Sequence, residues 1–317
     1  MSVLEVELDG QYRAIREAAG ALQRPDRYAI EVAGPEAGEY LQGQLTNDVE
    51  PLAAGEGCYA ALLDRKGHMQ ADMRVLRLDD AFAIGTEAVA APAVLRHLGM
   101  YKIGRDVEVI DRSSELAVIS VLGPASLELA LGAPLGPEHA HRRHDLDGIS
   151  TLAIATDLGV DLVIPHDEVD RVLQKLASAG AEPVSEDAAE IVRVESGRPR
   201  FGREMTTATI PQEAGINERA VSFTKGCYIG QETVARLHYR GKPNRQLRGL
   251  RLSAPAEAGD PIRLGERELG TIGTAVLSPR DGAIALAIVR REAEPGATVA
   301  VGDGLDAEVV ELPFQAR

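Results

Sequence analysis

The stretch between residues 116 and 184 constrains the fold most, because its order of strands and helices fits one familiar arrangement. The hydrophobic patterns predict, in order, a strand at 116–121, a helix at 125–131, strands at 151–155 and 159–164, a helix at 166–178 and a short strand at 182–184. A strand-helix-strand-strand-helix-strand order is typical of a ferredoxin-like domain. We therefore predict a compact α+β unit here.

One connection inside this unit contains several potential metal ligands. They are Glu138, His139, His141, His144 and Asp145. Imidazole and carboxylate groups bind zinc or iron, but the spacing of these residues matches no metal motif. Glycine, proline and arginine residues surround them, so we predict a solvated loop and no metal site.

The last part of the chain predicts a different architecture. Glycines separate short apolar segments at 247–252, 262–264, 269–278, 283–289, 298–301 and 307–312. Short strands with regularly spaced turns favour a small β-barrel. We place this barrel at residues 244–317.

The first 110 residues predict another α+β region. A helical face at 11–22 precedes a strand at 28–34 and a helix that Pro35 opens. An antiparallel meander, a further helix and a last strand follow, at 58–63, 73–78, 81–84, 87–99 and 106–110. Cys58 alternates with apolar residues and is predicted to lie in the core.

Composition restricts the class of function. The chain has 317 residues, a formal net charge of −15, two cysteines and no tryptophan. This charge disfavours nucleic-acid binding over the whole surface. Neither a signal peptide nor an apolar run long enough to span a membrane is evident, and two cysteines make no disulfide framework. We expect a cytoplasmic protein that does not bind membranes.

The segment with the strongest chemical character is Lys225–Glu232, KGCYIGQE. Its single thiol, Cys227, precedes a predicted helix beginning at Gln231, and the glycines at 226 and 230 allow unusual backbone geometry. The helix N-terminus and the Lys225 ammonium would favour the thiolate. The alternative is a small buried hydrophobic residue, as many free cysteines are.

This octapeptide, including Tyr228, Gln231 and Glu232, resembles the signature of the YgfZ family of folate-binding proteins, relatives of the glycine-cleavage T-protein (aminomethyltransferase). The resemblance extends along nearly the whole chain. It implies a T-protein-like three-domain ring around a central folate cavity. The implied domains are a discontinuous folate-binding domain at 1–110 and 185–243, the ferredoxin-like domain at 111–184, and the barrel.

The resemblance also implies folate-binding residues. Glu195 in RVESG matches a glutamate that binds pterin, whose two adjacent donors a carboxylate can accept together. The alternative is an exposed helical glutamate. In the segment GHMQADM, Ala71 stands at the first of two successive aspartate positions of the T-protein, taken as the catalytic one, and Asp72 stands at the second. Aminomethyl transfer is therefore doubtful, because adjacent strand residues face opposite ways.

Other residues are candidates for ligand contact. Asn47 could line the cavity or only turn the chain, and Tyr101 could stack on a ligand or lie in the core or at its rim. Lys225 to Arg251 contains seven basic residues and one acid, and Arg236 among them could hold a folate glutamate tail. RNA is another possible anion, but no aromatic ladder accompanies these residues.

The first functional hypothesis, implied by the resemblance, is a tetrahydrofolate-binding protein that assists iron–sulfur cluster assembly or repair in client enzymes. Cys227 would be the reactive residue; one cysteine cannot hold a cluster in the usual way, which takes four thiolates. The alternative is a tetrahydrofolate-dependent aminomethyltransferase or demethylase. A third hypothesis, an RNA-binding or tRNA-modification accessory, rests only on the basic stretch.

Overall fold

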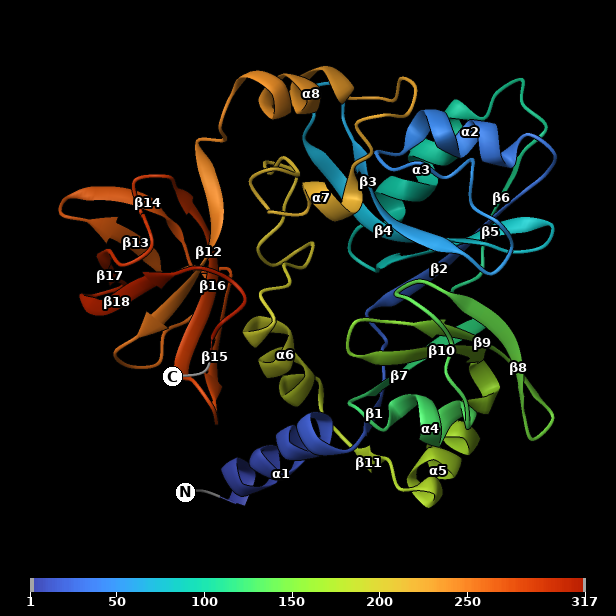
Figure 1. Cartoon of the computed structure of the whole chain (residues 1–317), viewed down its shortest axis with the longest axis horizontal. Coiled ribbons are helices and arrows are strands. Elements are labelled where there is room, and N and C mark those ends of the chain that lie inside the picture. Colours follow the sequence, from blue (N-terminus) through green and yellow to red (C-terminus); the bar gives the residue numbers. More distant parts are fainter. Residues whose placement is uncertain (1–2, 316–317) are drawn as a thin grey trace. The chain divides into compact units, whose positions relative to one another are not determined.

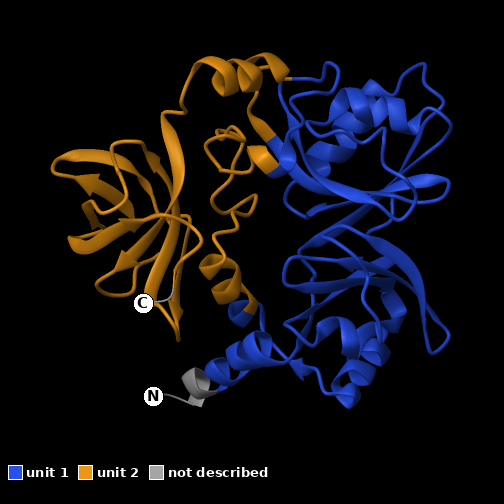
Figure 2. Cartoon of the chain, in the orientation of Figure 1, with its two compact units in different colours: residues 1–64, 70–188, 219–229 blue, residues 65–69, 189–218, 230–317 orange. Residues whose placement is uncertain are grey.

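The computed structural model describes residues 3–315, which divide into two compact units (Figure 2). Unit 1 contains the chain up to residue 64 together with 70–188 and 219–229. Unit 2 contains residues 65–69 and 189–218 and the chain from 230 onward. No helix among the described residues has the length and apolar character that crossing a membrane requires.

The first sheet of unit 1 has five strands in the order β3-β4-β5-β2-β6 (Figure 1). They are β2 (Arg27–Ala33), β3 (Gly57–Leu63), β4 (Met69–Arg77), β5 (Ala81–Glu87) and β6 (Glu108–Asp111), accompanied by helices α2 (Ala37–Gln44) and α3 (Ala91–Tyr101). Burial alternates along β4: Ala71, Met73 and Val75 are buried, and Asp72 and Arg74 between them are less so. The two faces of this sheet therefore differ, one apolar and one polar.

The second sheet of unit 1 contains the predicted ferredoxin-like elements. Its strand order is β11-β1-β7-β10-β9-β8. The predicted strands and helices are present as β7 (Leu116–Leu122), α4 (Ser126–Leu131), β9 (Ile149–Ala155), β10 (Gly159–Pro165), α5 (Val169–Ala179) and β11 (Glu182–Pro183), with a 3-10 turn η1 (His166–Glu168) before α5. Their apolar side chains form one core with the helices.

The solvated loop predicted around the histidines is wrong for residues 141–146, which form the edge strand β8 (His141–Leu146) paired antiparallel with β9. His141 is buried, and its ring nitrogens lie 3.1 Å from the His139 carbonyl oxygen and 3.0 Å from that of Arg77. The sequence HRRHDL hides this strand because its middle residues face solvent.

The helix predicted across 11–22 is also wrong in its second half. Helix α1 (Val3–Glu17) ends early, and β1 (Gly20–Gln23) enters the second sheet between β11 and β7. Gly20 permits this close packing, because a Cβ there would lie 2.7 Å from Val184 Cγ1. The ferredoxin-like sheet therefore includes a strand from outside the predicted range 111–184.

Unit 2 contains a seven-stranded, barrel-like sheet in the order β14-β13-β17-β18-β12-β16-β15. The strands are β12 (Arg245–Leu252), β13 (Pro261–Leu264), β14 (Arg267–Thr271), β15 (Thr274–Ser278), β16 (Gly282–Arg290), β17 (Thr298–Val301) and β18 (Leu305–Val310). The strand predicted at 269–278 is two strands. The two strands are separated at residues 272–273, where the Gly273 backbone NH donates to the Leu286 carbonyl oxygen at 2.9 Å.

Three helices precede this sheet along the chain: α6 (Glu186–Glu195), α7 (Asn217–Ala220) and α8 (Gln231–Arg240). Buried ion pairs hold the irregular segment after α6. Arg193 lies 2.8 Å from Glu190 and 3.1 Å from Glu204, and Arg200 lies 3.1 Å from Glu190. Because each buried charge has a partner, an irregular backbone can pack against the sheet without leaving charges unpaired.

Candidate functional site

A carboxyl group with an unused acceptor lies on the polar face of the first sheet of unit 1. Asp72 on β4 accepts a hydrogen bond from the Tyr59 hydroxyl on β3, with 2.7 Å between the oxygens. The other oxygen, Oδ1, is enclosed and has no hydrogen-bond partner within residues 3–315. Burial raises the pKa of Asp72, although the Tyr59 hydrogen bond and the Arg27 charge oppose this rise. An enclosed acceptor without a donor is costly unless a ligand or water satisfies it.

Arg219 lies over the same tyrosine. Its guanidinium carbon is 5.1 Å from the centroid of the Tyr59 ring, and its Nη2 lies 2.6 Å from Glu138 Oε1. Burial, followed by the charge of Asp72, raises the pKa of the Tyr59 hydroxyl well above its usual value. Tyr59 therefore remains a protonated hydrogen-bond donor at neutral pH.

A second carboxylate lies on β10 of unit 1. Arg74 Nη1 is 2.9 Å from Asp161 Oδ2, and the Ser120 hydroxyl donates to Oδ1 at 2.6 Å. Burial opposes ionisation of Asp161, but the Arg74 charge and the Ser120 hydrogen bond together hold its pKa below the usual range.

The charge of Arg27 acts on both Asp72 and Asp161 and lowers the pKa of each. Arg27 also pairs with the buried Glu87 at 2.6 Å. We call the group formed by Tyr59, Asp72, Arg74, Asp161 and Arg219, together with Arg27, the Asp72 cluster. Its members come from β2, β3, β4, β10 and α7.

The Asp72 cluster gives its two carboxyl groups different chemical properties. Asp161 has partners on both oxygens and stays ionised. Asp72 has a raised pKa and a free oxygen, so it can accept donors from a ligand or exchange a proton with it. Pairs of acids with pKa values shifted in opposite directions are common in functional sites.

Ala71 lies on the opposite face of β4 from Asp72. Its side chain is fully buried on the apolar face, in line with Met73 and Val75. A carboxylate at residue 71 would point into that core. The polar face carries Asp72, so the alanine at 71 does not remove a carboxylate from the candidate site.

Glu195, the predicted pterin ligand, is the last residue of α6 and lies in unit 2. Its side chain has no exposed surface. The Ser278 hydroxyl donates to Oε1 at 2.5 Å, and Arg280 Nη2 lies 3.7 Å from Oε2. The alternative of an exposed glutamate is therefore wrong. The predicted ligand role stays a prediction, for a carboxyl group that already has Ser278 on one oxygen.

The signature loop presents its thiol to solvent. Cys227 is exposed, and Tyr228 beside it is buried. Gly230 has φ +83° and precedes the first residue of α8, which confirms the predicted helix and the need for glycine there. Gly226 needs no such freedom: its φ lies outside the left-handed region, and an added Cβ would contact nothing within 4 Å.

Lys225, predicted to activate the thiol, contacts backbone carbonyls in unit 1. Its Nζ lies 2.7–2.8 Å from the carbonyl oxygens of Gln42, Leu45 and Asn47. Three carbonyls use all the donors of the ammonium. Cys58, the predicted core residue, is half-buried, and burial raises the pKa of its thiol to about 12.

Asn47 and Tyr101 also have contacts within unit 1. The Asn47 amide donates to the carbonyl oxygens of Tyr59 at 2.8 Å and Arg219 at 2.9 Å, so it holds together the backbone around the Asp72 cluster. Tyr101 ends α3 and is 39% exposed, and its ring stacks on His97 with 4.5 Å between centroids. It lies at the surface rather than in the core.

The basic stretch is partly neutralised by ion pairs inside unit 2. Arg245 pairs with Glu213, Arg248 with Glu311 and Arg251 with Asp281, at 2.8, 2.9 and 3.1 Å. Arg236 and Arg240 on α8 and the nearby Lys242 are exposed. An anionic ligand would therefore meet a smaller set of charges than the sequence suggests.

Comparison with known proteins agrees with this architecture. The family described as GCVT N-terminal domain matches residues 5–225, and the glycine cleavage T-protein C-terminal barrel domain matches residues 245–315. The chain belongs to the glycine-cleavage T-protein family. The structure of glycine cleavage system aminomethyltransferase T from Bartonella henselae is similar over 97% of this chain and 89% of its own, with a TM-score of 0.87 and 23% identity. The predicted T-protein fold is therefore confirmed.

Curated relatives cover nearly the whole chain. An aminomethyltransferase from Rubrobacter xylanophilus is 28% identical over 100% of this chain and 88% of its own length. An aminomethyltransferase from Symbiobacterium thermophilum is 30% identical, with 96% and 88% covered. A putative chloroplastic transferase from Arabidopsis thaliana is 28% identical, with 91% and 69% covered.

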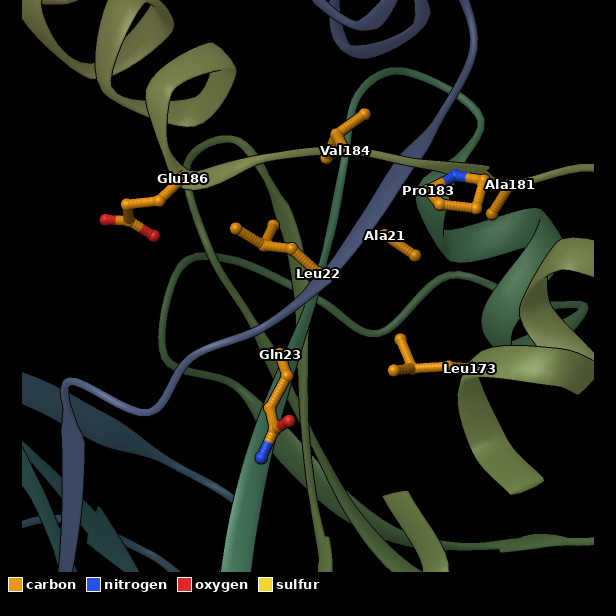
Figure 3. A pocket seen from close by; sticks show the side chains of 8 residues that line it. All are labelled: Ala21, Leu22, Gln23, Leu173, Ala181, Pro183, Val184 and Glu186. Atoms are coloured by element: carbon orange, nitrogen blue, oxygen red, sulfur yellow. The ribbon is translucent and has the colours of Figure 1, made fainter. Parts of the chain in front are cut away.

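This T-protein family member also has an apolar cavity of about 240 Å³ in unit 1 (Figure 3). Ala21, Leu22 and Gln23 of β1, Leu173 of α5, and four residues beside and within β11 line it: Ala181, Pro183, Val184 and Glu186. Arg24 already pairs with Glu186 at 3.3 Å. Ligand sites usually combine apolar walls with several converging polar groups, which favours the Asp72 cluster as the functional site.

Sequence reasoning missed Tyr59, Arg219 and Asp161. Asp161 had a detectable signal, because a single acid interrupts the apolar strand GVDLVIP. Tyr59 reads as an ordinary strand residue in GCYAALL. Arg219 had no signal, since it is 160 residues from Tyr59 in the sequence and only folding brings the two together.

Proposed function

We propose that this T-protein family member binds a reduced folate at the Asp72 cluster of unit 1. The observation that carries the proposal is the enclosed, unpartnered Oδ1 of Asp72 beside the protonated Tyr59. Members of this family use tetrahydrofolate, so a pterin is the first ligand to consider. Its 2-amino group and N3–H are adjacent donors that a carboxylate accepts.

Glu195 is the competing anchor. The family resemblance assigns it the pterin, whereas its contacts with Ser278 and Arg280 give it a role in packing unit 2. Ser278 already uses one Glu195 oxygen and Arg280 lies near the other, whereas Asp72 Oδ1 has no partner among the described residues. We therefore assign the pterin to Asp72 and use Glu195 as the alternative in the same experiment.

A calorimetric titration of tetrahydrofolate into the purified protein tests the ligand and its location together. We expect micromolar binding by the wild-type protein, loss of at least about tenfold in affinity in Asp72→Asn and little change in Glu195→Gln. The reverse order would assign the pterin to Glu195. No binding by the folded wild-type protein would reject the folate proposal.

We further propose that Cys227 gives this folate-binding protein a role in assembling or repairing iron–sulfur clusters in client enzymes. The KGCYIGQE segment resembles the YgfZ signature, and its thiol is exposed as a reaction with another protein requires. In cells lacking the protein, Cys227→Ser should fail to restore the activity of cluster-containing enzymes. Full restoration would reject this role, and Cys58→Ser is the matched control.

A second candidate, tetrahydrofolate-dependent aminomethyl transfer or demethylation, is favoured by one observation: Asp72 lies on the polar face of β4 with a raised pKa. A carboxyl group placed there could move a proton at a reacting folate nitrogen. The relatives named aminomethyltransferase make this reaction the one to assay. Formation of 5,10-methylene-tetrahydrofolate that Asp72→Asn abolishes would support it, and its absence with the wild-type protein would reject it.

A further inference from the structure

The ammonium of Lys225 occupies a site made of backbone oxygens in unit 1. Its Nζ lies 2.7 Å from the Gln42 carbonyl oxygen, 2.8 Å from that of Leu45 and 2.7 Å from that of Asn47. The three acceptors belong to the last turn of α2 and the residues just after it, where the helix dipole places negative partial charge. Three acceptors match the three donors of an ammonium, so Lys225 fits this site as a point charge.

The chain before Lys225 is attached to the same turn. Three hydrogen bonds join the two segments: Thr46 Oγ1 to the Ala220 carbonyl oxygen at 2.6 Å, Asn47 Nδ2 to that of Arg219 at 2.9 Å, and the Ser222 amide to the Thr46 carbonyl oxygen at 3.0 Å. After Lys225, the buried Tyr228 places its ring centroid 5.4 Å from Nζ. Cys227 is therefore an exposed residue between two fixed points.

We propose that Lys225 is a positioning residue for Cys227: by binding the carbonyls of Gln42, Leu45 and Asn47, it fixes the signature loop on the end of α2 and so determines where the thiol is presented. The functional meaning of this inference rests on the proposed role of Cys227. The contact itself is testable without folate or a client protein.

Lys225 is half-buried at this contact. Burial lowers its pKa to about 8, while the charges of Asp48 and Glu50 and the nearby Cys58 oppose this change. The contact is therefore tested at pH 7.0, where Lys225 is an ammonium.

Amide hydrogen exchange of residues 222–229 tests the proposal in a Cys227→Ser background. In Lys225→Met, the opening constant at pH 7.0, corrected for intrinsic exchange rates, should rise about tenfold because three carbonyls lose their donor. Lys225→Arg should open nearly as much, since a planar guanidinium cannot meet three converging oxygens.

The exposed Lys242 supplies the control, since Lys242→Met should leave exchange in the loop unchanged. Equal opening in Lys225→Met and the parent at pH 7 would overturn the proposal. If that variant does not fold, Lys225→Arg decides: opening equal to that of the parent at pH 7.0 overturns the proposal.

A second measurement connects the contact to the thiol. With Cys227 present and Cys58 replaced by serine, iodoacetamide alkylation at pH 7.0 should change at least about threefold in Lys225→Met and remain unchanged in Lys242→Met. An unchanged rate in Lys225→Met would show that Lys225 does not position Cys227. The two proposals can fail separately. If alkylation changes in Lys225→Met as expected but the protein does not take part in cluster repair, the role of Cys227 is rejected and the positioning of its loop by Lys225 is retained.

Discussion

Asp72 in unit 1 and Glu195 in unit 2 are both enclosed carboxyl groups, yet their surroundings differ. Glu195 has the Ser278 hydroxyl on one oxygen and Arg280 near the other. Asp72 has Tyr59 on one oxygen and no partner on the other within the described chain. The contacts of Glu195 are those of a residue that stabilises the fold of unit 2, whereas Asp72 has the unused acceptor that a ligand site requires.

A family resemblance identifies candidate ligand residues. Packing in the folded chain then decides which of these residues keep an acceptor that a ligand can use. The family resemblance selects Glu195 as the pterin ligand. It also places Ala71 of β4 at the catalytic aspartate position. The strand pleat then turns Ala71 into the core and Asp72 toward the polar cluster. Four substitutions test this difference between Asp72 and Glu195.

The largest effect should come from removing the structural acid. Glu195→Ala leaves Ser278 and Arg280 without their partner and creates a small cavity, so we expect a loss of about 3 kcal/mol in the free energy of unfolding. Urea unfolding measures it, with the exposed Glu268→Ala as control. Folate affinity should stay within about twofold. A stable variant that no longer binds folate would make Glu195 the ligand residue after all.

Asp72→Asn should weaken folate binding, in contrast to Glu195→Ala, which should mainly reduce stability. We expect folate affinity to fall by about tenfold to a hundredfold, which corresponds to about 1.5–3 kcal/mol, because a charged acceptor becomes a neutral amide. The exposed Asp79→Asn should bind like the wild-type protein. Retained affinity in Asp72→Asn would contradict the proposed site.

The stability of the same variant depends on pH. Because burial raises the pKa of Asp72, the folded chain binds more protons than the unfolded chain between the ordinary and the raised pKa. The stability that Asp72 contributes is present below its unfolded pKa and is lost as the pH rises through the folded pKa. Asp72→Asn should therefore unfold at higher urea than the wild-type protein at neutral pH, with a smaller difference toward pH 4.

Tyr59→Phe should have a smaller effect on binding. It removes the donor to Asp72 Oδ2, which is worth about 1 kcal/mol or roughly fivefold in folate affinity. That hydrogen bond lowers the pKa of Asp72, so its loss should move the pH dependence of folate binding to higher pH. Calorimetry between pH 5 and 9 measures both changes. An unshifted profile would separate Tyr59 from the titration of Asp72.

Glu138→Gln should have the smallest effect. Its ion pair with Arg219 is only partly buried, and such pairs contribute little. Without the opposing charge, Arg219 acts more strongly on Asp72 and favours the carboxylate. Folate binding at pH 7 should strengthen by about twofold, by calorimetry. Weaker binding would mean that Glu138 itself holds the ligand.

Much of the fold could be predicted from local patterns. The ferredoxin-like elements and the short barrel strands follow from hydrophobic periodicity and glycine turns. The patterns failed where an element depends on its neighbours. Strand β1 reads as the end of a helix until β7 and β11 pair with it, and β8 reads as a loop until β9 does.

The site was less predictable. Asp72 and Lys225 stand out in the sequence, but their roles depend on contacts distant in the chain. Lys225 meets carbonyls about 180 residues away, and carbonyl acceptors leave no trace in a sequence because every residue has one. Arg219 reaches Tyr59 in the same way.

The order of the domains, the family signature around Cys227 and the residues able to carry charge or act as nucleophiles can be read from the sequence. These properties are local, since they depend on residue type, spacing and turn chemistry. The folded chain alone shows that Asp72 keeps an oxygen without a partner among the described residues, that burial lowers the pKa of Lys225 and that Cys227 meets solvent. Burial and long-range partners set those properties, and both arise only when distant segments pack together.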